Sequence, residues 1–167
     1  MALGKLDFGG QCGVRLQEIR DLASDQPVFR EGRFIRGTRL NPLQPALPDR
    51  DRVTVQLLTP LVSKHQSDDP LCGALRTRLQ RLVNAYGDGQ PLAPPGTRPW
   101  RLVTARLRAQ IITQGLDSRR RIHGLCGELE LADLTPLGAQ WLAAGSLLHA
   151  GGEATLGFGQ YRWQSAD

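Results

Sequence analysis

The chain has 167 residues, of which 40% are hydrophobic and 22% charged, a composition that excludes a disordered chain and suits one globular domain with an extension. Its formal net charge is +5, and nearly all its basic residues are arginine, whose planar guanidinium can donate two parallel hydrogen bonds to a phosphate. No apolar run approaches the roughly 18 residues that a membrane span needs, and no signal peptide is apparent, so we expect a cytoplasmic protein without a membrane partner.

Cysteine usage gives no sign of a metal site. Cys12, Cys72 and Cys126 lie far apart, and neither their spacing nor that of the histidines matches a zinc site. An odd number of cysteines also argues against a disulfide scaffold. We therefore expect reduced thiols, no metal and no cofactor.

Residues 1–50 are expected to form an amino-terminal extension with one or two strands. Alternating apolar residues predict a strand over residues 13–19, and residues 33–36 predict a second one. Residues 41–48 contain three prolines, which neither donate to a β-ladder nor fit inside a helix, so we expect a linker there. The regular pattern that follows assigns residues 51–167 to the main domain.

The main domain is predicted to alternate strand, helix, strand, strand, helix, strand. Apolar residues recur at helical spacing from Leu71 to Tyr86, and Thr135 is placed to cap a helix that begins at Pro136. The strands are predicted at residues 52–58, 101–113 and 121–131, and through Trp163. This order predicts an α+β, ferredoxin-like (βαββαβ) antiparallel sheet with two helices on one face and the other face free.

The middle of the chain is strongly basic. Residues 71–121 carry ten arginines against two acidic residues, a net charge of +8, which is expected of a polyanion binder but also fits a solvated arginine-rich surface. Arg106 and Arg108 alternate with Leu107 and would point to the free face of the sheet. The predicted face lacks the stacking aromatic residues of the commonest RNA-recognition domain, which argues against base stacking there.

Five glycines lie within fifteen residues, from Gly145 near the end of the second predicted helix to Gly159 just before the last strand. Because glycine permits positive φ and close approach, such a loop can offer backbone N–H groups to phosphate oxygens. The alternative is a tight helix-to-strand connection whose glycines serve packing, and the spacing is neither that of a P-loop nor that of a dinucleotide fingerprint. The candidate RNA contacts in this loop are Gly151, Gly152, Gly157 and Gly159.

Two segments carry a resemblance to a known family: Thr59-Pro60 after an apolar strand, and residues 148–161 (LHAGGEATLGFGQY). They resemble the carboxy-terminal domain of the CRISPR-associated endoribonucleases that cut precursor CRISPR RNA. These enzymes belong to the RAMP superfamily, whose hallmark is a ferredoxin-like fold with a glycine-rich loop near its end. The resemblance covers roughly residues 51–167 and departs at Gly152 and Glu153, where the family often has lysine and glycine.

The resemblance implies an RNA partner, either CRISPR repeat RNA or mature crRNA, and other CRISPR effector subunits as further partners. It also implies cleavage without a metal, in which a 2′-hydroxyl attacks the adjacent phosphorus and leaves a 2′,3′-cyclic phosphate. Such a reaction needs a general acid or base, usually histidine. His123 is the first candidate and His149 and His65 are the others, although each of them can equally be a surface or packing residue.

The three consecutive arginines Arg119, Arg120 and Arg121 stand where the family has an arginine-containing segment between two strands. We expect them to hold phosphate, the alternative being a solvated turn. The longer relatives usually have a first ferredoxin-like domain that carries the catalytic histidine, so catalysis by this chain stays open. Two other functions stay open as well: a non-catalytic crRNA-binding subunit, and a protein–protein scaffold that docks to another ferredoxin-like subunit.

Overall fold

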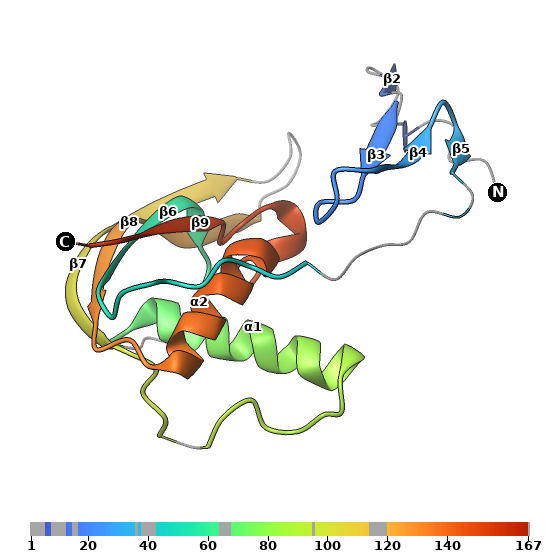
Figure 1. Ribbon diagram of the computed structural model, residues 1–167. Coiled ribbons are helices and arrows are strands. Elements are labelled where there is room, and N and C mark those ends of the chain that lie inside the picture. Colours follow the sequence, from blue (N-terminus) through green and yellow to red (C-terminus); the bar gives the residue numbers. More distant parts are fainter. Residues whose placement is uncertain are drawn as a thin grey trace. The chain divides into compact units, whose positions relative to one another are not determined.

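The computed structural model describes residues 6–7, 13–14, 17–35, 37, 43–63, 68–94, 96–113 and 120–166 (Figure 1). The chain divides into two compact units, Met1–Gln44 and Pro45–Asp167, and each is described here by itself. The division falls within the proline-rich segment of residues 41–48. Within the described ranges, neither long helix combines the length and apolar character needed to cross a membrane.

The first unit consists of short antiparallel strands. β1 (Leu6–Asp7) pairs with β2 (Gly13–Val14), and a second sheet has the order β3-β4-β5. These last three strands are β3 (Glu18–Arg20), β4 (Pro27–Arg30) and β5 (Arg33–Phe34). The unit thus has more and shorter strands than the one or two predicted, and turns at residues 22–24 and 31–32 connect β3, β4 and β5.

A small cluster holds the three-stranded sheet of the first unit together. The Phe29 ring is buried and meets the Phe34 ring edge to face, with centroids 5.2 Å apart. The Glu18 carboxylate accepts hydrogen bonds from the guanidinium groups of Arg20 and Arg30, and these bonds lower the pKa of Glu18. The contact with Arg30 joins β3 to β4, while the contact with Arg20 lies within β3.

The second unit confirms the predicted ferredoxin-like fold. Its elements are β6 (Val53–Leu61), α1 (Pro70–Tyr86), β7 (Arg101–Thr113), β8 (Arg121–Ala132), α2 (Pro136–Leu148), the short 3₁₀ helix η1 (Ala154–Leu156) and β9 (Tyr161–Ser165). The antiparallel sheet has the order β7-β8-β6-β9, and both long helices cover one of its faces (Figure 1). In this split β-α-β arrangement, no helix of the described residues covers the opposite face of the sheet.

Local signals in the sequence explain where the two helices begin. Asp69 accepts a hydrogen bond from the backbone N–H of Cys72 at 2.9 Å, and Pro70 follows it in the first turn of α1. Thr135 accepts one from the N–H of Gly138 at 3.1 Å and precedes Pro136 in the same way. Each cap satisfies an N–H that the helix itself leaves unpaired, as the sequence predicted for Thr135.

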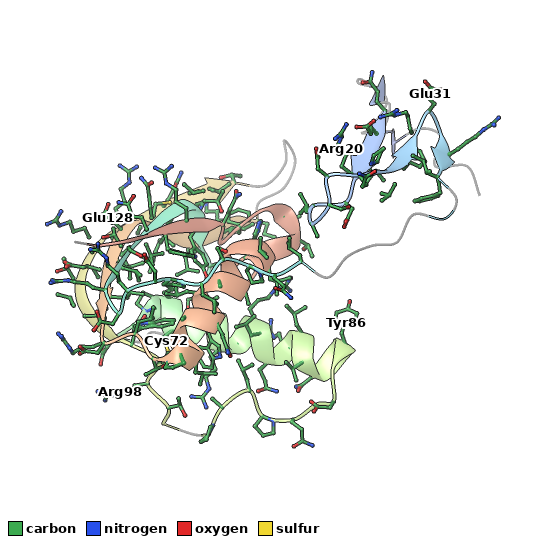
Figure 2. All side chains as sticks on the ribbon, in the orientation of Figure 1. Arg20, Glu31, Cys72, Tyr86, Arg98 and Glu128 are labelled. Atoms are coloured by element: carbon green, nitrogen blue, oxygen red, sulfur yellow. The ribbon has the colours of Figure 1, made fainter. Side chains whose placement is uncertain are left out.

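The core lies between the helices and the covered face of the sheet. Leu71, Leu75 and Leu79 of α1 are buried against alternate residues of the central strands. Those strand residues are Val53, Val55, Leu57, Leu129 and Leu131. Full burial of one such side chain contributes about 1.5–3 kcal/mol, so this layer supplies most of the drive for folding. Tyr86, which the helical pattern placed with them, is 87% exposed, because it lies at the far end of α1 (Figure 2).

One strand boundary differs from the sequence prediction. Pro60 was expected to end the first strand of the domain, but β6 runs on to Leu61 with an irregular register between Leu57 and Leu61. Proline lacks an N–H, and a β-bulge tolerates that loss. The Pro60 carbonyl oxygen accepts a hydrogen bond from the N–H of Gly159. The irregular part of β6 therefore anchors the glycine-rich loop.

Candidate nucleic-acid interface

The face of the sheet that no helix covers carries a polar row across all four strands. In the β-ladder Arg106 of β7 lies opposite Glu128 of β8, Glu128 lies opposite Gln56 of β6, and Gln56 lies opposite Arg162 of β9. Residues that face each other in antiparallel strands project to the same side of the sheet. Figure 2 shows Glu128 on the side of the sheet away from α1 and α2.

Two adjoining depressions follow this row. The first, of about 460 Å³, is lined by Arg106, Arg108 and Gln110 of β7 together with Gln56 and Glu128. The second, of about 220 Å³, shares Gln56 and Glu128 and extends to Arg162 and Gln164 of β9. The open face is therefore a continuous polar surface from one edge of the sheet to the other, and we call it the open-face groove.

The arginines of this region differ in how far the protein already uses them. Arg52 is paired with Glu130 at 2.5 Å, and the Nε of Arg162 donates to the Oε1 of Gln56 at 2.7 Å. Arg106 and Arg108 are exposed and have no hydrogen bond or ion pair to any described residue. The structure thus places both predicted arginines on the open face and leaves their guanidinium groups available for an anion.

The three consecutive arginines of the β7–β8 connection do not behave alike. Arg119 lies outside the described residues. Arg120 forms an ion pair with Glu153 of the glycine-rich loop, and Arg121 is exposed at the first position of β8. The connection between β7 and β8 is therefore tied to the glycine-rich loop by a carboxylate that sequence reasoning had treated only as a departure from the family pattern.

The candidate histidines occupy different parts of the domain. His65 lies outside the described residues, and His123 is exposed on β8 opposite Ile111. Because side chains alternate along a strand, His123 projects to the other side of the sheet from Cys126, which lines the open-face groove. The structure therefore does not bring His123 together with Arg106 and Arg108.

His149 has an unusual position at the end of α2. Its φ of 61° is in the left-handed region, and its side chain is half-buried. The Nδ1 atom is buried and has no hydrogen-bond partner among the described residues. A residue held in this conformation is fixed by the packing around it, so His149 shapes the start of the glycine-rich loop.

The backbone N–H groups of the glycine-rich loop are already used within the domain. Those of Gly151 and Gly152 donate to the carbonyl oxygens of Ala74 and Val62, those of Gly157 and Gly159 to the carbonyl oxygens of Ala154 and Pro60, and the four distances lie between 2.8 and 3.3 Å. These four N–H groups therefore have partners within the domain, and RNA contact by the loop stays a prediction. The bonds of Gly151, Gly152 and Gly159 reach α1 and β6 or the residue after it and close the loop on the domain, while that of Gly157 lies within the loop itself.

The loop also needs its glycines for space. A Cβ at Gly159 would lie 1.8 Å from the Ala150 carbonyl oxygen, and one at Gly151 would lie 2.3 Å from that of Val62. Both residues also have positive φ, which other residues adopt only with strain. The Thr59 hydroxyl donates to the Gly157 carbonyl oxygen and accepts from the Gln160 N–H, both at 2.8 Å. Packing is therefore the role of the loop that the geometry supports.

A separate depression, of about 650 Å³, lies beside the start of α1. Its lining includes Asp69, Cys72, Trp100 and Arg101. Asp69, besides capping the helix, accepts a hydrogen bond from the Trp100 indole N–H at 2.6 Å, so its carboxylate serves the fold. Burial raises the pKa of the Cys72 thiol to about 11, which leaves it protonated and unreactive at neutral pH. The described residues contain no group of three or more His, Cys, Asp or Glu side chains that could hold a metal.

Sequence reasoning missed several residues of the open-face groove, among them Gln56, Glu128 and Arg162. The alternation of Val53, Val55 and Leu57 in β6 carries a signal for Gln56, since it places that residue on the outer face. The neighbours of Gln56 depend on the pairing register of β6 with β8 and β9. The sequence of a single strand does not determine that register.

The fold and the open face together define a ferredoxin-like domain whose sheet has one polar face that no described helix covers. No protein-family model matches the chain, and no curated protein matches it either. Among solved structures, the Cas6 protein of Thermus thermophilus is 17% identical with a TM-score of 0.46, and the alignment covers 71% of this chain and 55% of that one. A Cas6 product complex is 19% identical with a TM-score of 0.45, and the alignment covers 71% of this chain and 52% of that one. A Cas6 substrate mimic complex is 18% identical with a TM-score of 0.43, and the alignment covers 70% of this chain and 54% of that one. The chain thus spans about half the length of these structures.

Proposed function

We propose that the Pro45–Asp167 unit binds CRISPR repeat RNA or crRNA through its open-face groove. The observation that carries this proposal is the pair Arg106 and Arg108, which stand on an uncovered sheet without a partner among the described residues. Exposed guanidinium groups of this kind bind phosphate, and the rest of the groove offers amide and carboxylate groups that can contact bases. The net charge of +8 over residues 71–121 and the resemblance of the glycine-rich segment to RAMP domains support the same proposal.

We further propose that any cleavage proceeds without a metal, through attack of a ribose 2′-hydroxyl on the neighbouring phosphorus. The 2′-oxygen–phosphorus bond forms while the bond to the 5′-oxygen breaks, a base removes the 2′ proton and an acid protonates the leaving 5′-oxygen. His123 is the exposed candidate for one of these proton transfers. Arg121, which begins the same strand, is a candidate to stabilise the charge that develops on the phosphate.

A non-catalytic crRNA-binding role is the second candidate function. Two observations favour it: His123 projects away from the face that carries Arg106 and Arg108, and the Nδ1 of His149 is buried. Neither histidine is therefore placed against the groove proposed to hold the RNA. In this function the domain retains RNA after it has been cut elsewhere.

One experiment separates these functions. The full chain is incubated with repeat RNA in EDTA, and both RNA retention and cleavage products are measured for the wild type, His123→Ala and His149→Ala. Cleavage that survives EDTA and is lost in His123→Ala supports the enzyme, while retention without cleavage supports the binding role. Absence of salt-dependent RNA retention overturns both functions.

A further inference from the structure

The open-face groove has one feature that phosphate binding does not explain: a carboxylate at its centre. Glu128 is exposed on β8, with Arg106 opposite it on β7 and Gln56 opposite it on β6. It makes no hydrogen bond or ion pair within the part of the chain that the structure describes. A carboxylate repels phosphate, so on an RNA-binding surface its useful partner is a hydrogen-bond donor on a base.

The neighbouring Glu130 is a useful contrast, because it stands two residues further along the same strand and on the same face. Its carboxylate is paired with Arg52 at 2.5 Å, and it therefore serves the sheet itself. The register also places Thr54 opposite Glu130, where Gln56 stands opposite Glu128. Of these two acids, only Glu128 combines an unused carboxylate with a neighbouring amide.

The orientation of that amide follows from its contact with Arg162. The Nε of Arg162 donates to Gln56 at 2.7 Å, and since arginine has no acceptor atom, the Gln56 atom facing it must be the amide oxygen. The Gln56 amide NH₂ group has no partner among the described residues and is thus a free donor. Gln56 and Glu128 are cross-strand neighbours, so a donor stands next to two carboxylate acceptors.

This donor–acceptor–acceptor pattern is complementary to the Watson–Crick edge of guanine. Guanine presents an O6 acceptor followed by the N1–H and N2–H₂ donors. The other three bases each present a single N–H or NH₂ donor group on that edge, so they can satisfy only part of the carboxylate. The edge is accessible only in an unpaired base, which a flat protein surface can hold as part of a single-stranded segment.

We propose that the open-face groove recognises one unpaired guanine of its RNA, with Glu128 accepting from N1–H and N2–H₂ and Gln56 donating to O6. This inference rests on the proposed RNA-binding function and adds the base that the groove selects. Arg106, beside Glu128, is placed to hold a phosphate next to the guanine. Arg162, oriented by its bond to Gln56, can stack its guanidinium plane on a base in place of the absent aromatic residues.

The test measures binding of the full chain to a uridine nonamer that carries G, inosine, A, C or U at its centre. We expect the G oligonucleotide to bind about tenfold more tightly than the all-uridine one, and inosine, which lacks the 2-amino group, to bind between them. In Glu128→Gln one acceptor is replaced by an NH₂ group that opposes the guanine donors, so the preference should vanish. Binding of the all-uridine RNA should be unchanged or slightly tighter, because a negative charge is lost.

Glu130→Gln is the matched control, since it removes the same charge from the same face and should retain the preference for G. Thermal melting of both variants checks that they fold. Equal, salt-dependent binding of all five oligonucleotides overturns the guanine inference and leaves the RNA-binding function standing. Retained preference in Glu128→Gln also overturns it, whereas failure of every oligonucleotide to bind overturns the RNA-binding function itself.

Discussion

The open-face groove and the glycine-rich loop were both expected to contact RNA, and the structure treats them in opposite ways. On the open face, Arg106 and Arg108 keep their charged groups free of any described partner. In the loop, the N–H groups of Gly151, Gly152, Gly157 and Gly159 all donate to carbonyl oxygens of the domain. The difference teaches that a residue type suited to a ligand is available to it only when the fold does not already use the same atoms.

The largest effect is expected from Gly159→Ala, which tests the structural role of the loop. A Cβ there would lie 1.8 Å from the Ala150 carbonyl oxygen, at a φ of 74°. Steric overlap and backbone strain together should lower the free energy of unfolding by about 3 kcal/mol or more. Gly157→Ala is the control: its φ of 84° is similar, but no atom lies within 4 Å of the new Cβ, so about 1 kcal/mol is expected. Equal losses in urea unfolding would contradict this account.

The second-largest effect is expected in the open-face groove, from a double variant that combines Arg106→Gln and Arg108→Gln. Loss of two phosphate contacts should weaken repeat-RNA binding about tenfold and reduce the slope of log K against log salt by about 2. Stability should be unchanged, since neither side chain has a described partner. Arg98→Gln, at an exposed position in the depression beside the start of α1, is the control and should leave binding unchanged. An unaltered salt slope in the double variant would place the RNA elsewhere.

Tyr161→Phe tests the anchor that follows the loop. The buried Tyr161 hydroxyl donates to the Leu142 carbonyl oxygen at 2.7 Å, and its removal should cost about 1 kcal/mol. Burial raises the pKa of Tyr161 above its unfolded value of about 10, so the hydroxyl stabilises the fold below that pH and this contribution is lost as pH rises. The stability difference between wild type and variant should therefore shrink above pH 10.

Urea unfolding at pH 8 and at pH 10.5 measures this difference. Tyr86→Phe is the control, because Tyr86 is 87% exposed and its removal should have no effect at either pH. A stability difference for Tyr161→Phe that is the same at both values of pH would exclude a buried neutral hydroxyl as its cause.

The smallest effect is expected from Glu153→Gln. Glu153 belongs to the glycine-rich loop and contacts the arginine-rich connection between β7 and β8. Glu153 pairs with Arg120, and both side chains are partly exposed, so the pair should contribute under about 1 kcal/mol to stability. Loss of the acid should raise RNA affinity about twofold, because one negative charge near the basic segment disappears. Glu31→Gln, which removes an exposed acid from the first unit, is the control. Weaker RNA binding in Glu153→Gln would mean that the ion pair positions Arg120 for the RNA.

The sequence by itself determined the fold of the main domain and the cap of its second helix. Alternation in the first strand of the domain involves Val53, Val55 and Leu57, and helical spacing in α1 involves Leu71, Leu75 and Leu79. The pattern within each element therefore predicts which of its faces is buried. Such patterns are local, because one strand or helix carries all the information needed to orient it. The outward position of Arg106 and Arg108 followed from the same rule.

Only the tertiary structure decided what the outward and loop residues can do. The pairing register placed Gln56 beside Glu128. The carbonyl oxygens of Pro60 and Val62 accept hydrogen bonds from N–H groups of the loop. Both depend on contacts between segments about 70 to 100 residues apart in the chain. Side-chain alternation predicts the direction in which a residue points. Whether that residue is available to RNA depends on whether distant parts of the chain already bond to it.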